Sequence, residues 1–352
     1  MSSSSSSDKK LRVKAVPVSL GARHPPSPHN VLPTHEFTMG IIAPKGSGKT
    51  TLMINLLAYY AKYFHAIYIF SPTVKNDEKW DWVKEQDLVL ENKPLAKWFR
   101  TFTADKGDNP VVDEPSGGDA LAALAGLVDQ NILAGGKVRD KADRFDGRIP
   151  AANFMYEYDE ADLARILAGQ QHLIDFLHEQ GVTKHLAHRT LFIFDDLVGS
   201  TLFSNARGNV FKRFNTNHRH LSNSVMMVSQ AYKEIPKTVR TNFSALVIFE
   251  IFSDAEIANI HDEFPMGLRK EQWEAMYAYA VTGEHSFLYY NMQKPQTQRI
   301  MKNFDQVLFF KEAGPAVAAG PLTPAGPGTL AAPKHPPKPA RQSGARRRIR
   351  RH

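Results

Sequence analysis

Short apolar runs alternate with stretches of helical spacing along the middle of the chain. The runs predict buried strands at residues 37–42, 66–70, 190–194, 225–228 and 245–251. Apolar residues at helical spacing predict helices at residues 52–57, 159–180, 254–264 and 270–282. Near-continuous apolar strands that alternate with helices are typical of a parallel sheet covered on both faces. We therefore predict an α/β fold with a mainly parallel central sheet flanked by helices.

Composition at the two ends predicts the domain organisation. Residues 1–33 are rich in Ser, Pro and His without periodicity, and residues 313–352 are rich in Pro, Gly and Ala before they become basic. Such compositions are typical of disordered arms and linkers. We expect a single domain at residues 34–312, with extra strands near its end at 286–292 and 307–310.

A segment of different composition interrupts this domain. Residues from about 105 to 150 contain two pairs of adjacent glycines and many Asp and Ala residues. Because long structureless loops are uncommon inside compact domains, we interpret this segment as an insertion that is helical around residues 119–133. The aromatic run at residues 98–102 just before it predicts a further strand.

Composition also narrows the class of protein. The 352 residues are 42% apolar, enough for a sizeable core, and include no cysteine, which excludes disulfides, thiol catalysis and Cys-ligated zinc. No apolar run reaches the length of a membrane span, and the Ser-rich start lacks the apolar segment of a secretion signal. We expect an intracellular protein that is neither secreted nor membrane-spanning.

A glycine-rich loop follows the first predicted strand and leads into a predicted helix. It comprises Ala43, Pro44, Lys45, Gly46, Ser47, Gly48, Lys49, Thr50 and Thr51. In this context of a P-loop, the glycines let backbone N–H groups turn toward phosphate oxygens, at a helix N-terminus that adds partial positive charge. Lys49 would reach the β- and γ-phosphates, and the Thr50 hydroxyl would ligate Mg²⁺.

The loop departs from the strict pattern G-x-x-x-x-G-K-[ST] at one position. Ala43 stands where the pattern has its first glycine. Since alanine has the smallest side chain after glycine, we interpret it as a tolerated variant. The alternative is a glycine-rich turn that spells Gly-Lys-Thr without binding phosphate, and the flanking strand and helix favour the P-loop.

Polar residues follow two of the later predicted strands. Asp195 and Asp196 come directly after the strand at 190–194, and Gln230 ends the next one. Ligands of open α/β sheets bind at the carboxyl ends of strands. Asp195 would hold Mg²⁺ through its water shell, Asp196 would orient or deprotonate the attacking water, and Gln230 would sense the γ-phosphate or position water. The alternatives are a helix N-cap for the acids and a satisfied loop amide for Gln230.

The order of these motifs is similar to that of a known group of viral enzymes. The matching segments, in order, are 43–50, 194–197, 219–220, 228–230 and 235–242. They resemble the genome-packaging ATPases of large double-stranded DNA viruses, in the poxvirus-type branch of the FtsK–HerA superfamily of P-loop NTPases. The resemblance covers roughly residues 35–310.

This resemblance implies a fold, an activity and partners. The fold would be a RecA-like core, and the activity would be Mg²⁺-dependent ATP hydrolysis that translocates double-stranded DNA into a preformed capsid. The subunits would form a homo-oligomeric ring, a hexamer or a pentamer, that contacts a capsid component. The protein would be located in the virion or in a cytoplasmic viral factory of the host cell. Within the site, Lys49, Thr50, Asp195 and Asp196 would bind or hydrolyse the nucleotide, with Gln230 as sensor.

The resemblance also implies an arginine finger, a residue that reaches the γ-phosphate bound by a neighbouring subunit and stabilises charge in the transition state. It favours Arg219, although Arg207, Arg213 and Arg240 compete for this role. The alternative for each of these arginines is a solvated charge on a helix.

Two further functions fit part of the pattern. A P-loop with threonine also serves nucleotide and small-molecule kinases, but kinases usually lack a paired-acid strand followed by a strand ending in Gln. A nucleic-acid-binding virion protein with a degenerate site is the other alternative, and the intact Gly-Lys-Thr and both acids argue against it. No N-K-x-D guanine signature is present, so ATP is the expected nucleotide.

The net charge of +8 is concentrated in the tails. Residues 334–352 carry eight Lys or Arg and no acid. Contact with the DNA backbone is the direct hypothesis for this basic tail. A nuclear import signal, an acidic protein partner and a merely solvated tail are the alternatives.

Overall fold

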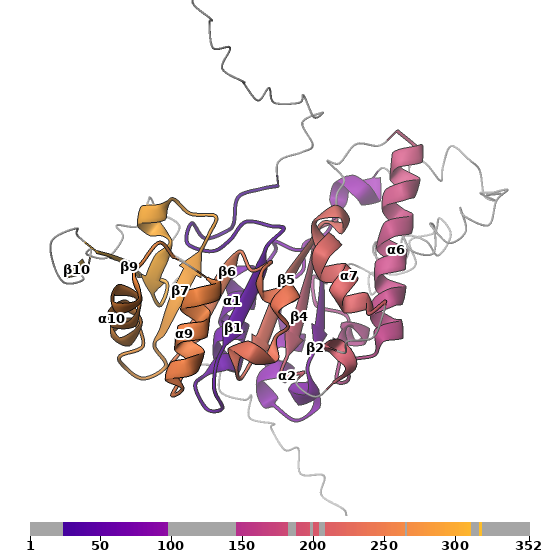
Figure 1. Cartoon of the computed structure of the whole chain (residues 1–352). Coiled ribbons are helices and arrows are strands. Elements are labelled where there is room, and N and C mark those ends of the chain that lie inside the picture. Colours follow the sequence, from indigo (N-terminus) through magenta and orange to yellow (C-terminus); the bar gives the residue numbers. More distant parts are fainter. Residues whose placement is uncertain are drawn as a thin grey trace, which may run out of the picture.

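A computed structural model describes residues 24–97, 146–181, 188–197, 200–203, 208–264, 266–310 and 317–318. These residues form an extended sheet with helices on both faces (Figure 1). The strand predicted at 98–102, most of the predicted insertion and the basic tail lie outside the described residues.

The sheet has ten strands in the order β10-β9-β8-β7-β6-β1-β5-β4-β2-β3. Their bounds are β1 Thr38–Ile42, β2 Ala66–Phe70, β3 Phe154–Met155, β4 Thr190–Asp195, β5 Asn223–Ser229, β6 Ala245–Phe249, β7 Phe287–Asn291, β8 Ile300–Lys302, β9 Gln306–Phe309 and β10 Val317–Ala318. The strands from β6 to β3 in this order pair in parallel, and β7 to β10 extend the β6 edge in antiparallel fashion. This topology confirms the predicted RecA-like α/β fold class with its extra C-terminal strands.

Helices cover the two faces of the sheet. The α-helices are α1 Lys49–Tyr59, α2 Glu78–Glu85, α6 Glu160–Glu179, α7 Val210–Asn217, α8 Lys237–Arg240, α9 Asp254–Glu263 and α10 Lys270–Ala280. The 3₁₀ helices are η1 Pro72–Lys75, η3 Ala151–Asn153, η5 Thr201–Phe203, η6 His218–Leu221, η7 Tyr232–Glu234 and η8 Gln296–Gln298. One apolar cluster joins α1 and α2 to one face, and a second joins α6, α7, α9 and α10 to the other.

Helix α1 is anchored by apolar side chains that point into the first cluster. Leu52, Met53, Leu56 and Leu57 are each at most 7% exposed. Burying an aliphatic side chain of this size contributes about 1.5–3 kcal/mol. The N-terminus of α1, which follows the glycine-rich loop, is therefore held firmly against the sheet.

Ordered structure begins before the predicted boundary at residue 34. Leu32 is buried, the Tyr60 hydroxyl donates to the Pro33 carbonyl at 2.6 Å, and the Tyr289 hydroxyl donates to the Val31 carbonyl at 2.9 Å. The segment 24–33 is therefore part of the domain. Its carbonyls are satisfied by distant tyrosines, a kind of contact that leaves no periodicity in the sequence.

The other end of the domain also differs from the prediction of an end near residue 312. Strand β10 pairs with β9 in antiparallel register, with Val317 opposite Phe309. Two residues of strand surrounded by Gly, Pro and Ala have too little apolar pattern to be recognised. Within the residues that the model describes, no helix combines the length and apolarity needed to cross a bilayer.

Candidate functional site

The loop between β1 and α1 is a tight turn that depends on two glycines. Gly46 and Gly48 have φ angles of 84° and 99°, in the left-handed region that favours glycine. Gly48 is the N-cap of α1, so Lys49 is the first helical residue. Ala43 is buried, donates its N–H to the Ser229 carbonyl at 3.0 Å and is not among the positive-φ residues. The first loop position therefore accepts a Cβ.

The start of α1 presents N–H donors to any ligand at the loop. The first N–H groups of a helix have no partner within the helix, and the helix dipole places partial positive charge there. Among the described residues, no side chain caps this end. Ser47 Oγ donates to the Pro44 carbonyl at 2.7 Å and closes the turn, Thr50 is half-buried, and Lys45 and Thr51 are exposed. This helix end is suited to an anion.

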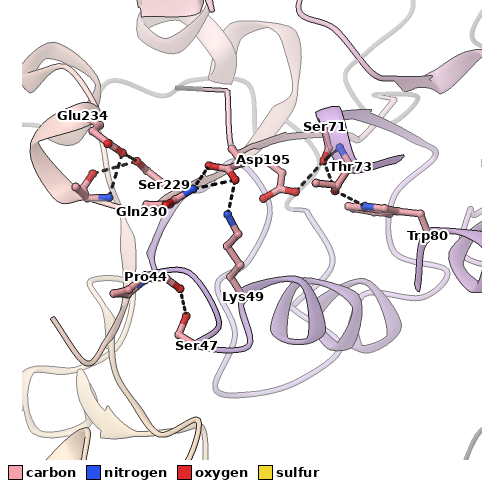
Figure 2. Close-up of polar contacts among 12 residues, drawn as sticks. Pro44, Ser47, Lys49, Ser71, Thr73, Trp80, Asp195, Ser229, Gln230 and Glu234 are labelled. Atoms are coloured by element: carbon pink, nitrogen blue, oxygen red, sulfur yellow. Dashed lines mark hydrogen bonds and ion pairs between the residues drawn. The ribbon is translucent and has the colours of Figure 1, made fainter. Parts of the chain in front are cut away.

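The sheet brings the loop, the acids and the amide to one edge. Strand β5 lies between β1 and β4; Ile42 at the end of β1 is level with Ser229 at the end of β5, and Asp195 at the end of β4 is level with Val228, one residue earlier. The residues that follow leave the sheet side by side at its carboxyl edge, and these are Ala43, Asp196 and Gln230. Figure 2 shows the Lys49 side chain extending from the loop toward this edge, where Asp195 and Gln230 lie.

Asp195 is a buried carboxylate with one free oxygen. It ends β4, is 1% exposed, and accepts a hydrogen bond from Ser71 Oγ at 2.8 Å through Oδ2. Its Oδ1 has no partner within the described part of the chain. Burial raises the pKa of this carboxyl, and the hydrogen bond from Ser71 and the charge of Lys49 oppose the shift only in part.

Oδ1 of Asp195, unpartnered among the described residues, has the properties expected of a metal ligand. A buried carboxylate oxygen without a donor costs free energy unless a cation or a water fills the space before it. Mg²⁺ prefers a small number of protein oxygens together with waters and phosphate oxygens. Asp195 and the Thr50 hydroxyl therefore fit as residues that could hold Mg²⁺.

Asp196 carries two donors on its carboxylate. Lys49 Nζ lies 2.7 Å from Oδ2, and Gln230 Nε2 lies 2.8 Å and 3.0 Å from the two oxygens. Burial alone would raise the pKa of Asp196, but the hydrogen bonds from Lys49 and Gln230 outweigh it and lower this pKa. The carboxylate is therefore ionised at neutral pH, as a base that accepts a proton from water must be.

The backbone of Asp196 explains why this position is not Glu. Its φ of 52° lies in the left-handed region, where Asp and Asn are enriched several-fold over longer side chains. Asp at the second acid position is therefore the residue that this sharp turn after β4 favours.

Two residues that the sequence reasoning did not single out hold these groups in place. Ser71 follows β2, the neighbour of β4, and belongs to a chain of hydrogen bonds that continues through Thr73 to Trp80 Nε1. Glu234 accepts from Ser229 Oγ at 2.7 Å, next to Gln230. Position after a predicted strand was an available signal for Ser71, whereas nothing in the local pattern marks Glu234.

Arg240 is a structural residue. Its side chain is 7% exposed and donates two hydrogen bonds of 2.7 Å to the Glu263 carboxylate on α9. It also donates to the Ile235 carbonyl at 2.6 Å. A guanidinium held in this way does not reach a second subunit, so Arg240 is removed from the candidates for an arginine finger.

Arg219 lies far from the loop of its own chain. It is exposed, belongs to η6 just before β5, and therefore sits at the amino edge of the sheet, opposite the P-loop. There it lines a cavity of about 440 Å³ together with Glu36, Asn242 and Gln293. Arg213 is exposed on α7, and Arg207 lies outside the described residues.

The chain is similar in fold to several solved structures. One is the genome packaging NTPase B204 from Sulfolobus turreted icosahedral virus 2 in complex with ATP-gammaS, with 11% identity, a TM-score of 0.40, and coverage of 76% of this chain and 95% of that one. VirB4 of Thermoanaerobacter pseudethanolicus has 13% identity, a TM-score of 0.35, and coverage of 75% and 88%. Both TM-scores lie below 0.5. The comparison with curated proteins found no match.

The family comparison is specific. The model of the poxvirus A32 protein family matches residues 28–89 and 152–281, more than half of the 352 residues. The matched segments contain the glycine-rich loop, both acids, Gln230 and Arg219. The gap between them, at 90–151, contains the whole of the predicted insertion at about 105–150. The chain therefore belongs to the poxvirus A32 protein family, as its resemblance to the poxvirus-type branch of the FtsK–HerA superfamily predicted.

Proposed function

We propose that this protein is an ATP-hydrolysing motor that translocates double-stranded DNA and packages a viral genome into a preformed capsid. The observation that carries the proposal is the convergence of Lys49, Asp195, Asp196 and Gln230 on one sheet edge beside a helix N-terminus. Membership in the poxvirus A32 family supports the viral context.

The loop 43–51 binds the phosphates of ATP. Its backbone N–H groups and the N-terminus of α1 supply donors and partial positive charge. Lys49 exchanges its partner Asp196 for phosphate oxygens when the nucleotide binds. This exchange leaves the Asp196 carboxylate facing the terminal phosphate, with Gln230 still beside it.

Thr50 and Asp195 hold Mg²⁺ together with the nucleotide. The ion neutralises negative charge on the phosphates when it is bound. Ser71 donates to Oδ2 of Asp195 and leaves Oδ1 available to the ion. Asp195 is therefore the metal-holding acid and Asp196 is the base.

Asp196 orients the attacking water and accepts its proton. A carboxylate that is ionised at neutral pH and hydrogen-bonded by an amide is suited to this role. Gln230 positions the same water or senses the γ-phosphate. Because Glu234 braces the chain beside Gln230, the amide keeps its direction as the phosphate departs.

Arg219 acts in trans in a homo-oligomeric ring of five or six subunits. Its place at the sheet edge opposite the P-loop suits contact with a neighbour and excludes contact with the nucleotide of its own chain. An arginine of this kind contributes on the order of 10³–10⁵ in rate.

The substrate is duplex DNA, and a capsid component is a further partner. The eight cations of the basic tail favour contact with the phosphate backbone, with a slope of log K against log salt of about −7 if all of them pair. The protein acts in the virion or in a cytoplasmic viral factory of the infected cell.

The test is the ATPase rate with and without linear duplex DNA, measured together with the mass of the assembly. DNA-stimulated hydrolysis that is lost in Lys49→Ala would support the motor. Vigorous hydrolysis that responds to no nucleic acid would count against it, and transfer of phosphate to a hydroxyl acceptor would favour a kinase. Nucleotide binding without hydrolysis would favour a non-hydrolysing virion protein that binds nucleic acid.

A further inference from the structure

An aromatic ring stands in solvent at the sheet edge that carries the P-loop. Phe252 follows β6 and is 85% exposed. The other exposed large apolar side chains of the described residues are only 41–46% exposed. A single exposed apolar residue is common on protein surfaces. A role for Phe252 must therefore be argued from its position.

The chain that carries Phe252 is fixed next to the P-loop. Strand β6 is the parallel neighbour of β1, with Ile248 opposite Ile42, so the two following segments leave the sheet side by side. The buried Tyr277 hydroxyl donates to the Phe249 carbonyl at 2.9 Å and accepts from the Ile251 N–H at 2.7 Å. The backbone that leads to Phe252 is thus fixed up to the preceding residue.

A second ring reaches the P-loop from the turn before β7. His285 Nδ1 lies 2.9 Å from the Ser47 carbonyl oxygen, and its ring is 60% exposed. Strand β7 is antiparallel to β6, with Phe287 opposite Phe249, so this turn lies at the same edge as Phe252. His285 has a φ of 57°, uncommon for a residue other than glycine.

The acids determine the direction of a bound nucleotide. Asp195 and Asp196 follow β4, so the reacting γ-phosphate must point from β1 toward β5 and β4. The nucleoside then extends to the other side of β1, where β6 ends and β7 begins. Phe252 and His285 are exposed rings close to these two strand ends, whereas Phe249 and Phe287 within the strands are buried.

We propose that Phe252 and His285 form the wall that receives the purine base of ATP. The proposal rests on the proposed function, because it takes the triphosphate to lie on the P-loop. An exposed aromatic ring can stack on a nucleotide base, since every base has a π-face. Phe252 supplies the stacking surface. His285, which contacts the Ser47 carbonyl, supplies the part of the wall next to the P-loop.

The test compares two probes that share the triphosphate and differ in the base. The affinities of Mg²⁺-ATP and of Mg²⁺-tripolyphosphate are measured by calorimetry for the wild type, Phe252→Ala, Phe252→Trp and Lys49→Ala. Tyr156→Ala is the matched control, because Tyr156 is an exposed ring beyond β3, at the far end of the sheet. Phe252→Ala should weaken ATP binding about 10-fold and leave tripolyphosphate unchanged, while Phe252→Trp should retain both affinities.

These measurements distinguish a failure of the base wall from a failure of the proposed function. Equal ATP affinity in Phe252→Ala and the wild type would overturn the base wall, and so would an equal loss for tripolyphosphate, which would indicate a disturbed loop. An unchanged affinity for both probes in Lys49→Ala would overturn the proposed P-loop. Because the readout is binding, a wild type that binds ATP without hydrolysing it would overturn the motor and leave the base wall decided by the Phe252 variants.

Discussion

The ammonium of Lys49 donates to Oδ2 of Asp196 over 2.7 Å, so the proposed phosphate-binding lysine and the proposed base are paired with each other. The two side chains are 14% and 24% exposed. Gln230 contacts the same carboxylate from the other side. In the proposed mechanism, nucleotide binding breaks the contact between Lys49 and Asp196 and leaves the contact between Gln230 and Asp196 in place. Substitutions can therefore test the role of each residue separately.

Asp196→Asn should separate binding from hydrolysis. The substitution keeps the size of the side chain and suits the left-handed backbone, but the amide cannot accept a proton from water. Hydrolysis should fall on the order of 10²–10⁴-fold, while ATP affinity stays equal or improves because Lys49 is released. Single-turnover hydrolysis and equilibrium binding measure the two effects. Asp81→Asn, on the exposed face of α2, is the control, and wild-type turnover in Asp196→Asn would contradict the assignment.

Asp195 gives a prediction about pH and stability. Burial raises the pKa of this carboxyl in the folded protein above its ordinary value of 3.8. Between these two pKa values the folded state binds more protons than the unfolded chain, so the contribution of Asp195 to the free energy of unfolding falls as pH rises through this window. Asp195→Asn removes that loss.

The nucleotide-free Asp195→Asn protein should therefore denature at a higher temperature than the wild type near neutral pH. The advantage should shrink at acidic pH, where the wild-type carboxyl is protonated. Its Mg²⁺-dependent ATP binding should be lost at the same time. Thermal denaturation over a pH series measures this, and a variant less stable than the wild type at neutral pH would argue against a strained buried carboxylate.

Ser71→Ala tests the residue that orients Asp195. Without the Ser71 hydroxyl, both oxygens of the buried carboxylate lack a donor, so the pKa of Asp195 should rise further. Loss of an orienting partner typically costs about 10–100-fold in metal affinity. Mg²⁺-dependent ATP binding should weaken in this range, and its pH midpoint should move upward. Thr73→Val, one step further from the acid, should have a smaller effect.

Arg240→Ala should lower the stability of the fold, whereas Arg219→Ala should lower ATP hydrolysis. Removing Arg240 leaves Glu263 without its buried partner and should cost about 3 kcal/mol of unfolding free energy. Arg219 is exposed, so its removal should leave stability unchanged and reduce ATP hydrolysis. Denaturant unfolding and ATPase assays on both variants measure the contrast. A strongly destabilised Arg219→Ala would show that its role is structural.

Mixing subunits tests whether Arg219 acts in trans. Arg219→Ala subunits keep an intact P-loop, and Lys49→Ala subunits keep an intact arginine. Each preparation alone should be nearly inactive, whereas a mixture should recover hydrolysis wherever the two kinds adjoin. A mixture no more active than its components would indicate that Arg219 does not complete a neighbour's site.

The parts of this fold that were predictable from sequence are those with local patterns. Continuous apolar runs marked β1, β2, β4, β5 and β6, and strand-end position marked Asp195, Asp196 and Gln230. Contacts between distant segments had no such pattern. His285 meets Ser47 across 238 positions, and the Tyr289 hydroxyl satisfies Val31 across 258. Contacts of this kind form only when the sheet brings distant segments together, so the local sequence pattern does not predict them.

The direct test of the motor is ATP-driven displacement of a third strand from a linear duplex. A translocating ring removes a triplex-forming oligonucleotide bound ahead of it, whereas an enzyme that only hydrolyses ATP does not. We expect the wild type to displace the third strand only with Mg²⁺-ATP, and Lys49→Ala and Asp196→Asn to leave it in place. A wild type that forms rings, hydrolyses ATP and leaves the third strand in place would contradict it.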